Sequence, residues 1–410
     1  MEVDLIDMSN NETKTHLLDR LDRLLDRDST EIQSWERGYF DNFAGSKADR
    51  LVLCGSGGLG RKTLYGLRLV GIEPLAFTDN DARKWGQKIE GIEILSPEEA
   101  ISRFSSTAIF VITVWGAYAK DRMSDRIQKW TQFGCDRVTT FLPLFWKFPE
   151  VFLPYWACDL PHRVIESKIQ IQQVATLWSD TASLAQFIDQ VKWRLSGDFD
   201  LFPEPSLGKI YFSPLFIQLL SEEHFVDCGA FTGDTLVDFL ALAGNDFYKY
   251  TALEPDPQNF AKLSRFVAKC GIEHQNKIEL LPYASYSSRQ TLRFSASGNA
   301  SSACTVDGDL EVQGERLDTI FATESPTFVK LDIEGGEMEA LIGAKQLLQK
   351  FRPIVAVSIY HVQDHLWQIP TLLSSILSDY KFYAIAHDRE GWDLVMYAIP
   401  QERHRMGQSN

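Results

Sequence analysis

The pattern of apolar and polar positions changes character near residue 50. Before it, leucines recur at steps of three and four among charged residues, which gives one apolar face and predicts an amphipathic helix over 12–37. After it come short apolar runs such as RLVLC, EPLAFTD and AIFVIT, separated by glycine turns and helical stretches. Strands that alternate with helices predict a parallel sheet covered on both faces.

Residues 141 to about 222 interrupt this alternation. The proline-rich and aromatic run FLPLFWKFPEVFLPYW precedes an amphipathic stretch that predicts one long helix near 163–195, followed by the loop SGDFDLFPEPSLG. From Glu223 the alternation resumes and closes with a helix and a hairpin through Ile399. A polar segment from Ser295 to Asp309 breaks it once, either as a lid whose Ser301 or Ser302 touches a ligand or as a surface excursion.

The fold class predicted from this pattern is α/β, with two tandem open, mostly parallel sheets joined by a helical connector. A chain of 410 residues is long enough for two domains of about 100–200 residues each. The expected parts are an N-terminal helical segment (1–48), a Rossmann-like nucleotide-binding domain (49–140), a helical and aromatic connector (141–222), a second α/β domain (223–400) and a tail (401–410).

Composition excludes several classes of function. A net charge of -15 argues against a nucleic-acid partner, because phosphates require a basic surface. The longest apolar stretch, AIFVITVWGAYA, has 12 residues, and the acidic start resembles no secretion signal, so we expect a cytoplasmic protein with no membrane partner. The six cysteines show no paired spacing, which favours buried reduced thiols over a zinc site or disulfides.

The first glycine turn, GSGGLG, lies between a predicted strand and a predicted helix. Gly55, Gly57 and Gly60 make the spacing GxGxxG, and Asp79 ends the next strand 24 residues after Gly55. Such glycines let the backbone close on a pyrophosphate at a helix N-terminus, while the acid reaches a ribose. We therefore predict a second nucleotide site here, and the alternative is a Rossmann-like domain kept for packing or partner contacts. The segment resembles the small Rossmann-like domains of sugar-modifying enzymes, including bacterial sugar acetyltransferases, so a nucleotide sugar is as reasonable a ligand as NAD.

The second glycine turn, VDCGAFTGDT, has a different spacing. Gly229 and Gly233 are separated by three residues, Asp227 precedes them at the strand end, and Glu254 closes the next strand 25 residues after Gly229. This spacing fits a pyrophosphate less well than a ligand with a sulfonium and an amino-acid tail, which needs nearby carboxylates, bare backbone and an acid that binds both ribose hydroxyls. S-adenosylmethionine is such a ligand.

Over roughly Lys209 to Pro400 the sequence resembles the FkbM family of methyltransferases. The stretches that carry the resemblance are YFSP, FVDCGAFTGDT, ALEPDPQNFAKL, GERLDTI, FVKLDIEGGEMEALIGA and RPIVAVSIYH. The resemblance implies a class I methyltransferase fold in the domain at 223–400, S-adenosylmethionine as cofactor, and O-methylation of a sugar, a glycan intermediate or another small hydroxylated molecule. The cofactor-binding residues it implies are Asp227, Gly229, Ala230, Gly233, Glu254 and Ala284, with Tyr283 beside Ala284 near the adenine.

Candidate catalytic groups lie at the ends of two adjacent predicted strands. Asp332, Glu334 and Glu337 follow the strand in KLDIEGGE, and His361 ends SIYH, so all should meet in the ligand crevice at the carboxyl ends of the strands. We expect Asp332 and Glu334 to contact a substrate hydroxyl or a hard divalent ion such as Mg²⁺. His361, with an ordinary pKa of about 6.5, is the expected general base.

Local structural roles compete with these assignments. The acids also suit the positive end of the helix that follows them, and His361 also suits a hydrogen bond at a strand end. His365 would share a helix face with His361 if HVQDH were helical, which invites a metal, but no further ligand is evident and no metal-ligand set is assigned. Trp367 and Trp392 are expected in the core.

Two other classes of function remain open from the sequence. One is a nucleotide-binding regulatory protein without turnover. The other is an NAD-dependent oxidoreductase that uses the first glycine turn, although no hydride-transfer apparatus follows that turn.

Overall fold

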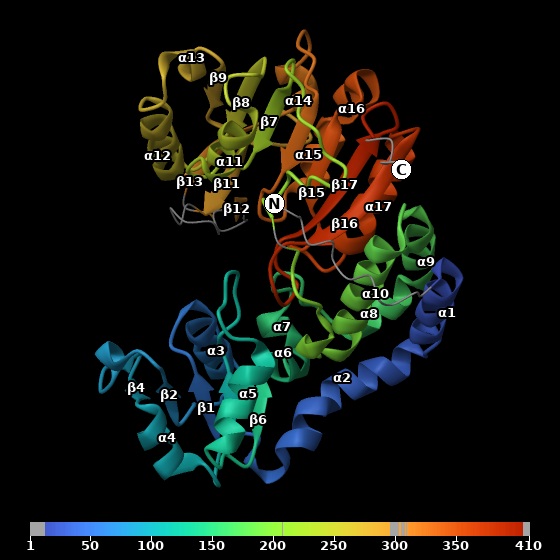
Figure 1. The fold of residues 1–410 in the computed structure, drawn as a ribbon. Coiled ribbons are helices and arrows are strands. Elements are labelled where there is room, and N and C mark those ends of the chain that lie inside the picture. The colour runs from blue at the N-terminus through green and yellow to red at the C-terminus, as the bar shows by residue number, and fades with distance from the viewer. Residues whose placement is uncertain (1–12, 207, 296–302, 305–307, 309, 405–410) are drawn as a thin grey trace, which may run out of the picture.

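The computed structural model describes residues 13–206, 208–295, 303–304, 308 and 310–404 (Figure 1). The described chain begins with two helices, α1 (Lys14–Leu25) and α2 (Ser29–Ala44), and not with the single helix expected over 12–37. The break has a local cause, because the Asp28 carboxylate accepts hydrogen bonds from the backbone N–H groups of Thr30 and Glu31 and so begins a new helix. In Figure 1, α2 runs from the N-terminal sheet to the connector helices.

The first alternation forms a six-stranded sheet in the order β3-β4-β2-β1-β5-β6. Its strands are β1 (Leu51–Cys54), β2 (Ala76–Thr78), β3 (Lys88–Ile89), β4 (Ile92–Leu95), β5 (Ile109–Ile112) and β6 (Val138–Thr140). The helices between them are α3 (Gly58–Leu69), α4 (Pro97–Phe104) and α5 (Met123–Gln132). Every neighbouring pair is parallel except β3 and β4, and the central strands β1 and β5 are buried along their whole length, as their continuous apolar runs require.

The connector contains several short helices. They are α6 (Leu142–Lys147), α7 (Pro149–Phe152), α8 (Pro161–Glu166), α9 (Lys168–Leu177) and α10 (Thr181–Ser196). The single helix expected near 163–195 is therefore wrong, since the chain turns at Ser167 and again before Asp180, whose carboxylate caps α10 by accepting from the Ser183 N–H. The aromatic run is buried, with Phe145 and Phe152 stacked at 4.3 Å between ring centroids.

The second alternation forms a seven-stranded sheet in the order β16-β17-β15-β14-β7-β8-β9. Its strands are β7 (His224–Cys228), β8 (Lys249–Leu253), β9 (Ile278–Leu281), β14 (Phe328–Leu331), β15 (Ile354–Ser358), β16 (Tyr380–Ala386) and β17 (Leu394–Pro400). The helices of this part are α11 (Asp234–Ala243), α12 (Pro257–Val267), α13 (Ile272–Gln275), α14 (Leu317–Ile320), α15 (Glu337–Gly343), α16 (Lys345–Phe351) and α17 (His365–Ile376). The sheet is parallel except at β17, which pairs antiparallel with both β15 and β16 and forms the expected closing hairpin.

A four-stranded sheet in the order β10-β13-β11-β12 lies beside the larger one. Its strands are β10 (Tyr283–Ser285), β11 (Gln290–Ser295), β12 (Ala303–Cys304) and β13 (Leu310–Glu315). The apolar stretch IELLPYA divides at Pro282 between the two sheets, since proline has no N–H for a ladder. Most of the polar segment from Ser295 to Asp309, including Ser301 and Ser302, lies outside the described residues.

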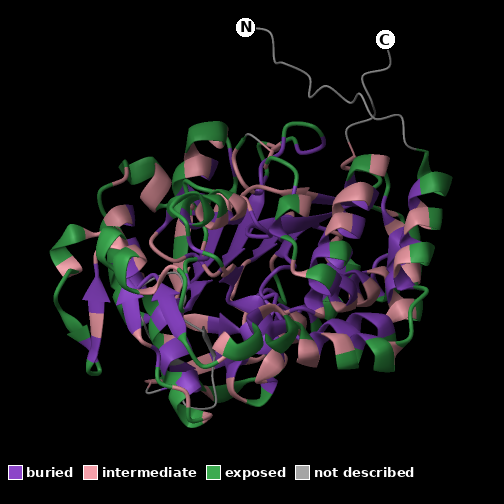
Figure 2. Ribbon diagram, turned by 90° about the horizontal axis from the view of Figure 1, so that it is seen from below, coloured by how far each residue is buried: buried purple, intermediate pink, exposed green. Residues whose placement is uncertain are grey.

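The connector covers one edge of the seven-stranded sheet. The Ser179 N–H donates to the Phe382 carbonyl at 2.9 Å, the Ser183 hydroxyl accepts from the Ala384 N–H at 3.0 Å, and the Ser206 N–H donates to the Ala386 carbonyl at 2.9 Å. These bonds satisfy the outer side of β16, beside which α10 lies in Figure 1. Figure 2 shows most strands of the large sheets in the colour of buried residues, with exposed residues on the outer helices. No helix in the described part of the chain is long and apolar enough to cross a bilayer.

Candidate functional site

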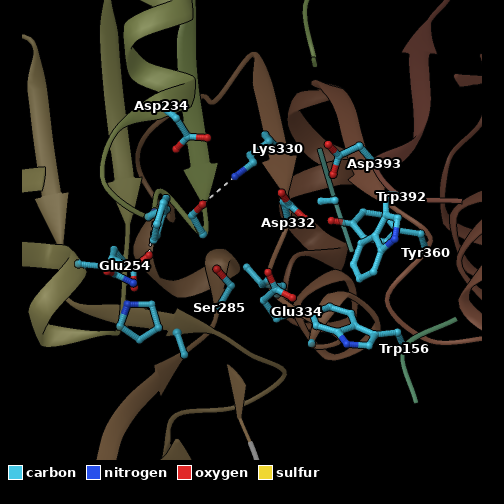
Figure 3. Close-up of a pocket in the computed structure, with 18 of the residues that line it drawn as sticks. Trp156, Asp234, Glu254, Ser285, Lys330, Asp332, Glu334, Tyr360, Trp392 and Asp393 are labelled. Atoms are coloured by element: carbon cyan, nitrogen blue, oxygen red, sulfur yellow. Dashed lines mark hydrogen bonds between the residues drawn. The ribbon is translucent and has the colours of Figure 1, made fainter. Parts of the chain in front are cut away.

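A cavity of about 430 Å³ lies where the carboxyl ends of both large sheets meet. Its walls come from the loop after β5, from the connector, and from the loops after β7, β8, β14 and β15. Figure 3 shows Glu254 and Ser285 on one side, Trp156 and Trp392 on the other, and the acids Asp332 and Glu334 between them. The cavity therefore brings the second glycine turn and the strand-end acids into one space.

Gly229 shapes the floor of this cavity. Its φ is 82°, in the left-handed region, and an added Cβ would lie 2.0 Å from the Asp332 carbonyl oxygen. Only glycine fits this position, because β7 and β14 approach each other directly beneath the turn. The backbone of the turn therefore remains bare toward the cavity, as the sequence predicts for a ligand that lies against it.

Glu254 is held in place by backbone donors. One carboxylate oxygen accepts from the Phe231 N–H and the other from the Asp256 N–H, both at 2.8 Å. Burial nevertheless dominates and raises the pKa of Glu254 to about 7. A carboxylate oxygen can accept more than one hydrogen bond and Glu254 lines the cavity, so the group can still bind a ligand hydroxyl.

The other residues expected at the cofactor divide into two groups. Ala284 lines the cavity together with its neighbour Tyr283. Within the described residues, Asp227, Ala230 and Gly233 are absent from the lining. Gly233 instead caps the start of α11 with a φ of 97°, and an added Cβ there would lie 3.0 Å from Leu263 Cδ1.

Asp227 lies beneath the turn and not beside the cavity. Its carboxylate is fully buried, 2.9 Å from the Lys330 Nζ, and accepts a 2.5 Å hydrogen bond from the Tyr250 hydroxyl. Asp227 therefore acts on the site through Lys330, which differs from the direct contact that the sequence suggested.

Lys330 is a site residue that the sequence reasoning missed. It lies within β14, is only 2% exposed and lines the cavity, and its ammonium donates to the Gly229 carbonyl at 2.7 Å. Burial disfavours the charged form, but Asp227, Asp332 and Asp234 outweigh it and raise the pKa of Lys330. The sequence does contain a signal for Lys330, because it is a single lysine in the apolar run FVKL. A charged residue in a buried strand needs a charged partner, so such a lysine indicates a buried ion pair.

The strand-end acids and His361 converge as their positions in the sequence predict. The His361 Nδ1 lies 2.8 Å from Glu337 Oε1, and its Nε2 lies 3.4 Å from Asp332 Oδ1 and 3.5 Å from Glu334 Oε2. Burial lowers the pKa of His361, but the carboxylates, led by Glu337, outweigh it and raise that pKa well above its ordinary value. Both ring nitrogens therefore carry protons near neutral pH.

This charge state works against the role of general base expected for His361. A doubly protonated ring has no lone pair with which to accept a proton, and Asp332 and Glu334 line the cavity in its place. Glu334 has a φ of 58°, and its pKa is raised, chiefly by burial and also by Asp332 and Glu337, although His361 opposes the shift. Glu334 can therefore exchange a proton closer to neutral pH than an ordinary glutamate.

Glu337 is fully buried and holds the backbone after β14 and two histidines together. Its Oε1 accepts from the backbone N–H groups of Ile333 and Gly335 at 3.0 and 3.3 Å, and its Oε2 lies 3.2 Å from His365 Nδ1. Although burial opposes it, the two histidines lower the pKa of Glu337. Since α17 begins only at His365, the expectation that His361 and His365 share a helix face is wrong, and both meet at Glu337 instead.

The same cluster bears on the expected Mg²⁺. Asp332, Glu337 and His361 offer ligand atoms within 4.8 Å of one another. A charged imidazole ring has no lone pair for a metal, and the ion pairs already account for the arrangement. The geometry gives the expected Mg²⁺ no support.

An aromatic wall closes the cavity opposite Glu254. Trp115 follows β5 and Trp156 belongs to the connector, and their rings lie 4.7 and 5.1 Å from the ring of Trp392. Trp392 lines the cavity and is also part of the buried core, and Trp367 is buried as well, as expected for both. Next to this wall, burial raises the pKa of Asp393 to about 7.

The first glycine turn borders a second cavity of about 850 Å³. Gly55 and Gly57 line it, whereas Gly60 packs α3 against the turn, since a Cβ there would lie 2.0 Å from the Gly55 carbonyl oxygen. Asp79 also lines it, but its Oδ2 already accepts from the Ser56 N–H at 3.0 Å and from Lys84 Nζ at 2.8 Å.

These contacts decide the charge state of Asp79. Burial favours the neutral acid, yet the bonds from Lys84 and Ser56 outweigh it and lower the pKa of Asp79 to about 2. The carboxylate thus closes the turn, which differs from the free acid expected to reach a ribose.

The fold belongs to the α/β class, with two open, mostly parallel sheets. Residues 227–384 match the family described as Methyltransferase FkbM domain. The resemblance noted in the sequence motifs is thereby confirmed.

The whole chain is similar in fold to the methyltransferase FkbM from Methylobacillus flagellatus KT, with a TM-score of 0.74 and 20% identity over 94% of this chain and 100% of that one. The likeness includes the N-terminal sheet and the connector, and at this identity it concerns the fold alone. An rRNA methylase from Streptococcus thermophilus is a distant neighbour, with a TM-score of 0.27 and 18% identity over 45% of this chain and 90% of that one. No curated protein sequence matches the chain significantly.

Proposed function

We propose that the protein transfers a methyl group from S-adenosylmethionine to an oxygen of a small hydroxylated acceptor, such as a sugar or a glycan intermediate. The observation that supports this most is the single cavity that joins Gly229 and Glu254 to Asp332 and Glu334. A methyltransferase needs donor and acceptor aligned in one space together with a group that takes the acceptor proton.

The residues present fit the cofactor. Gly229 leaves bare backbone at the cavity floor, and Glu254 keeps acceptor positions for two ribose hydroxyls while backbone N–H groups fix its orientation. Asp332 provides negative charge where a sulfonium is favoured. When bound, S-adenosylmethionine supplies an electrophilic methyl group.

On the acceptor side, Glu334 is the proposed general base. Its raised pKa brings it nearer the range in which a base accepts a proton efficiently at neutral pH. Asp332 is held by the Tyr211 hydroxyl, which donates to its Oδ2 at 2.7 Å, and by His361 on its other oxygen. Asp332 is therefore positioned to orient an acceptor hydroxyl, and His361 is a positioning residue that fixes both acids.

The aromatic wall suits an acceptor with one apolar face and several hydroxyls. Trp115, Trp156 and Trp392 offer flat apolar surface. The Trp392 Nε1 and the Asp393 Oδ2 are buried atoms without a hydrogen-bond partner among the described residues, and a ligand hydroxyl would satisfy each of them. Carboxylates and aromatic faces side by side support a sugar-like acceptor.

Thermal unfolding with S-adenosylhomocysteine tests the proposal, with NAD in a parallel sample. A ligand at a hundred times its dissociation constant stabilises the domain that binds it by about 2.7 kcal/mol, a midpoint shift of roughly 5–11 °C for 150–250 residues. Glu254→Ala should abolish the shift, whereas the matched control Glu273→Ala, at an exposed site on α13, should retain it. A shift with NAD alone would contradict the proposal and favour the oxidoreductase alternative.

A further inference from the structure

The two cavities share one wall. Residues 115–117, which follow β5, line both the catalytic cavity and the cavity beside the first glycine turn. We infer that the methyl acceptor spans both, with a diphosphate held by the N-terminal cavity and a hydroxylated ring, joined to that diphosphate, in the catalytic cavity. This inference rests on the proposed function and names its substrate class as a sugar linked to a nucleoside diphosphate.

The N-terminal cavity is built to receive an anion. The 12-residue helix α3 begins at Gly58 with Gly57 as its cap, and no described side chain caps it, so its first N–H groups stay available. Independently, Thr78 lines the cavity and is only 1% exposed, and its hydroxyl has no hydrogen-bond partner within the described chain. A phosphate oxygen would satisfy this buried donor together with the helix end.

Two lysines at the rim supply positive charge. Lys120 and Lys129 line this cavity, are exposed, and form no ion pair with any residue that the structure describes. Lys84 is already paired with Asp79, and the rim also carries Asp121 and Asp125, so net charge does not drive the recognition. We therefore assign phosphate binding to the free N–H groups of α3, the Thr78 hydroxyl and the two unpaired lysines.

The wall between the cavities is fixed to the acceptor side of the catalytic site. The Trp115 indole N–H donates to the Glu390 carbonyl at 3.4 Å, Arg389 donates to the Lys120 carbonyl at 2.9 Å, and Arg126 lies 3.6 Å from the Glu390 carboxylate. The loop that holds Glu390 also carries Trp392 and Asp393 into the catalytic cavity. A ligand anchored at α3 and crossing residues 115–117 thus meets the aromatic wall and the unsatisfied Asp393 oxygen directly.

Isothermal titration in the presence of S-adenosylhomocysteine tests this, with pyrophosphate, UDP, UDP-glucose, GDP-mannose and free glucose as probes. In Gly57→Leu the new side chain enters the N-terminal cavity without strain, because Gly57 has a φ of -79° and its Cβ would meet nothing within 4 Å. We expect all phosphate probes to bind at least about tenfold more weakly to it, because the leucine occupies the space beside the first N–H groups of α3 and prevents their hydrogen bonds to the phosphate. The matched control Gly271→Leu, where a Cβ also meets nothing within 4 Å, should bind as the wild type does.

A second variant tests the crossing between cavities. Asp393 has a φ of 49°, which asparagine tolerates, and Asp393→Asn should weaken a nucleotide sugar while leaving UDP and pyrophosphate unchanged. The inference is overturned if no phosphate probe binds the wild type, if Gly57→Leu and Lys129→Ala both keep the affinities, or if Asp393→Asn leaves every sugar probe unaffected. Binding of S-adenosylhomocysteine, measured on the same samples, reports separately on the proposed function and shows that each variant is folded.

Discussion

The buried pair of Lys330 and Asp227 predicts a large and specific loss of stability. Their side chains are 2% and 0% exposed, and the ammonium lies 2.9 Å from the carboxylate. In Lys330→Met the methionine fills most of the space, but Asp227 keeps its charge with only the Tyr250 hydroxyl to compensate it. Leaving one member of a buried pair uncompensated costs about 3–5 kcal/mol. For a domain of 150–250 residues this lowers the melting temperature by roughly 6–20 °C.

A double variant separates the charge from the packing. In Lys330→Met with Asp227→Asn neither charge remains and the Tyr250 hydroxyl keeps an acceptor, so we expect at least about half of the lost stability to return. The matched control is Lys249→Met on β8 of the same sheet, whose partly exposed pairs with Glu279 and Glu324 should be worth under about 1 kcal/mol. Urea unfolding of these variants gives the free energies. Additive effects of the two substitutions would refute the reasoning.

Three further predictions concern two acids of the catalytic cavity and His361. Because burial raises the folded pKa of Glu254 from 4.5 to about 7, the stability it contributes is fully present below pH 4.5 and lost as the pH rises to 7, by up to about 3 kcal/mol. Urea unfolding against pH should therefore give a flatter profile for Glu254→Gln, and parallel profiles would contradict the shift. Glu334→Gln should lower kcat by about 10²–10⁴-fold with unchanged affinity for S-adenosylhomocysteine. His361→Gln should move the acidic limb of the rate profile to higher pH, because the ring charge lowers the pKa of Glu334, and an unmoved limb would refute the positioning role.

The sequence was most informative where chemistry demands a residue type at a strand end. Gly229 and Glu254 were predicted from the turn and its spacing, and the convergence of Asp332, Glu334 and His361 follows from the order of parallel strands. The sequence also predicted the two alternations of strands and helices, because parallel strands that are buried on both faces give continuous apolar runs.

The failures have physical causes. Apolar residues keep a helical period across both breaks, so periodicity alone predicts one helix over 12–37 and one near 163–195. The carboxylates of Asp28 and Asp180 each cap the start of a new helix and so divide these two stretches. The charge state of His361 depends on three carboxylates of one segment, residues 332–337, and a sequence shows their number but not their distances from the ring. The tertiary fold alone shows that Trp115, which lies far from the catalytic motifs in sequence, closes the same cavity.

The covered edge of β16 has a consequence for dividing the chain. A fragment that starts at residue 223 would retain all seven strands of the larger sheet but would lose the groups of Ser179, Ser183 and Ser206 that bind β16 from outside. An uncovered strand of seven residues presents unpaired N–H and C=O groups to any similar edge. The isolated fragment would therefore pair with copies of itself through β16. In the full chain the connector covers this edge and so protects the protein from aggregation through its own sheet.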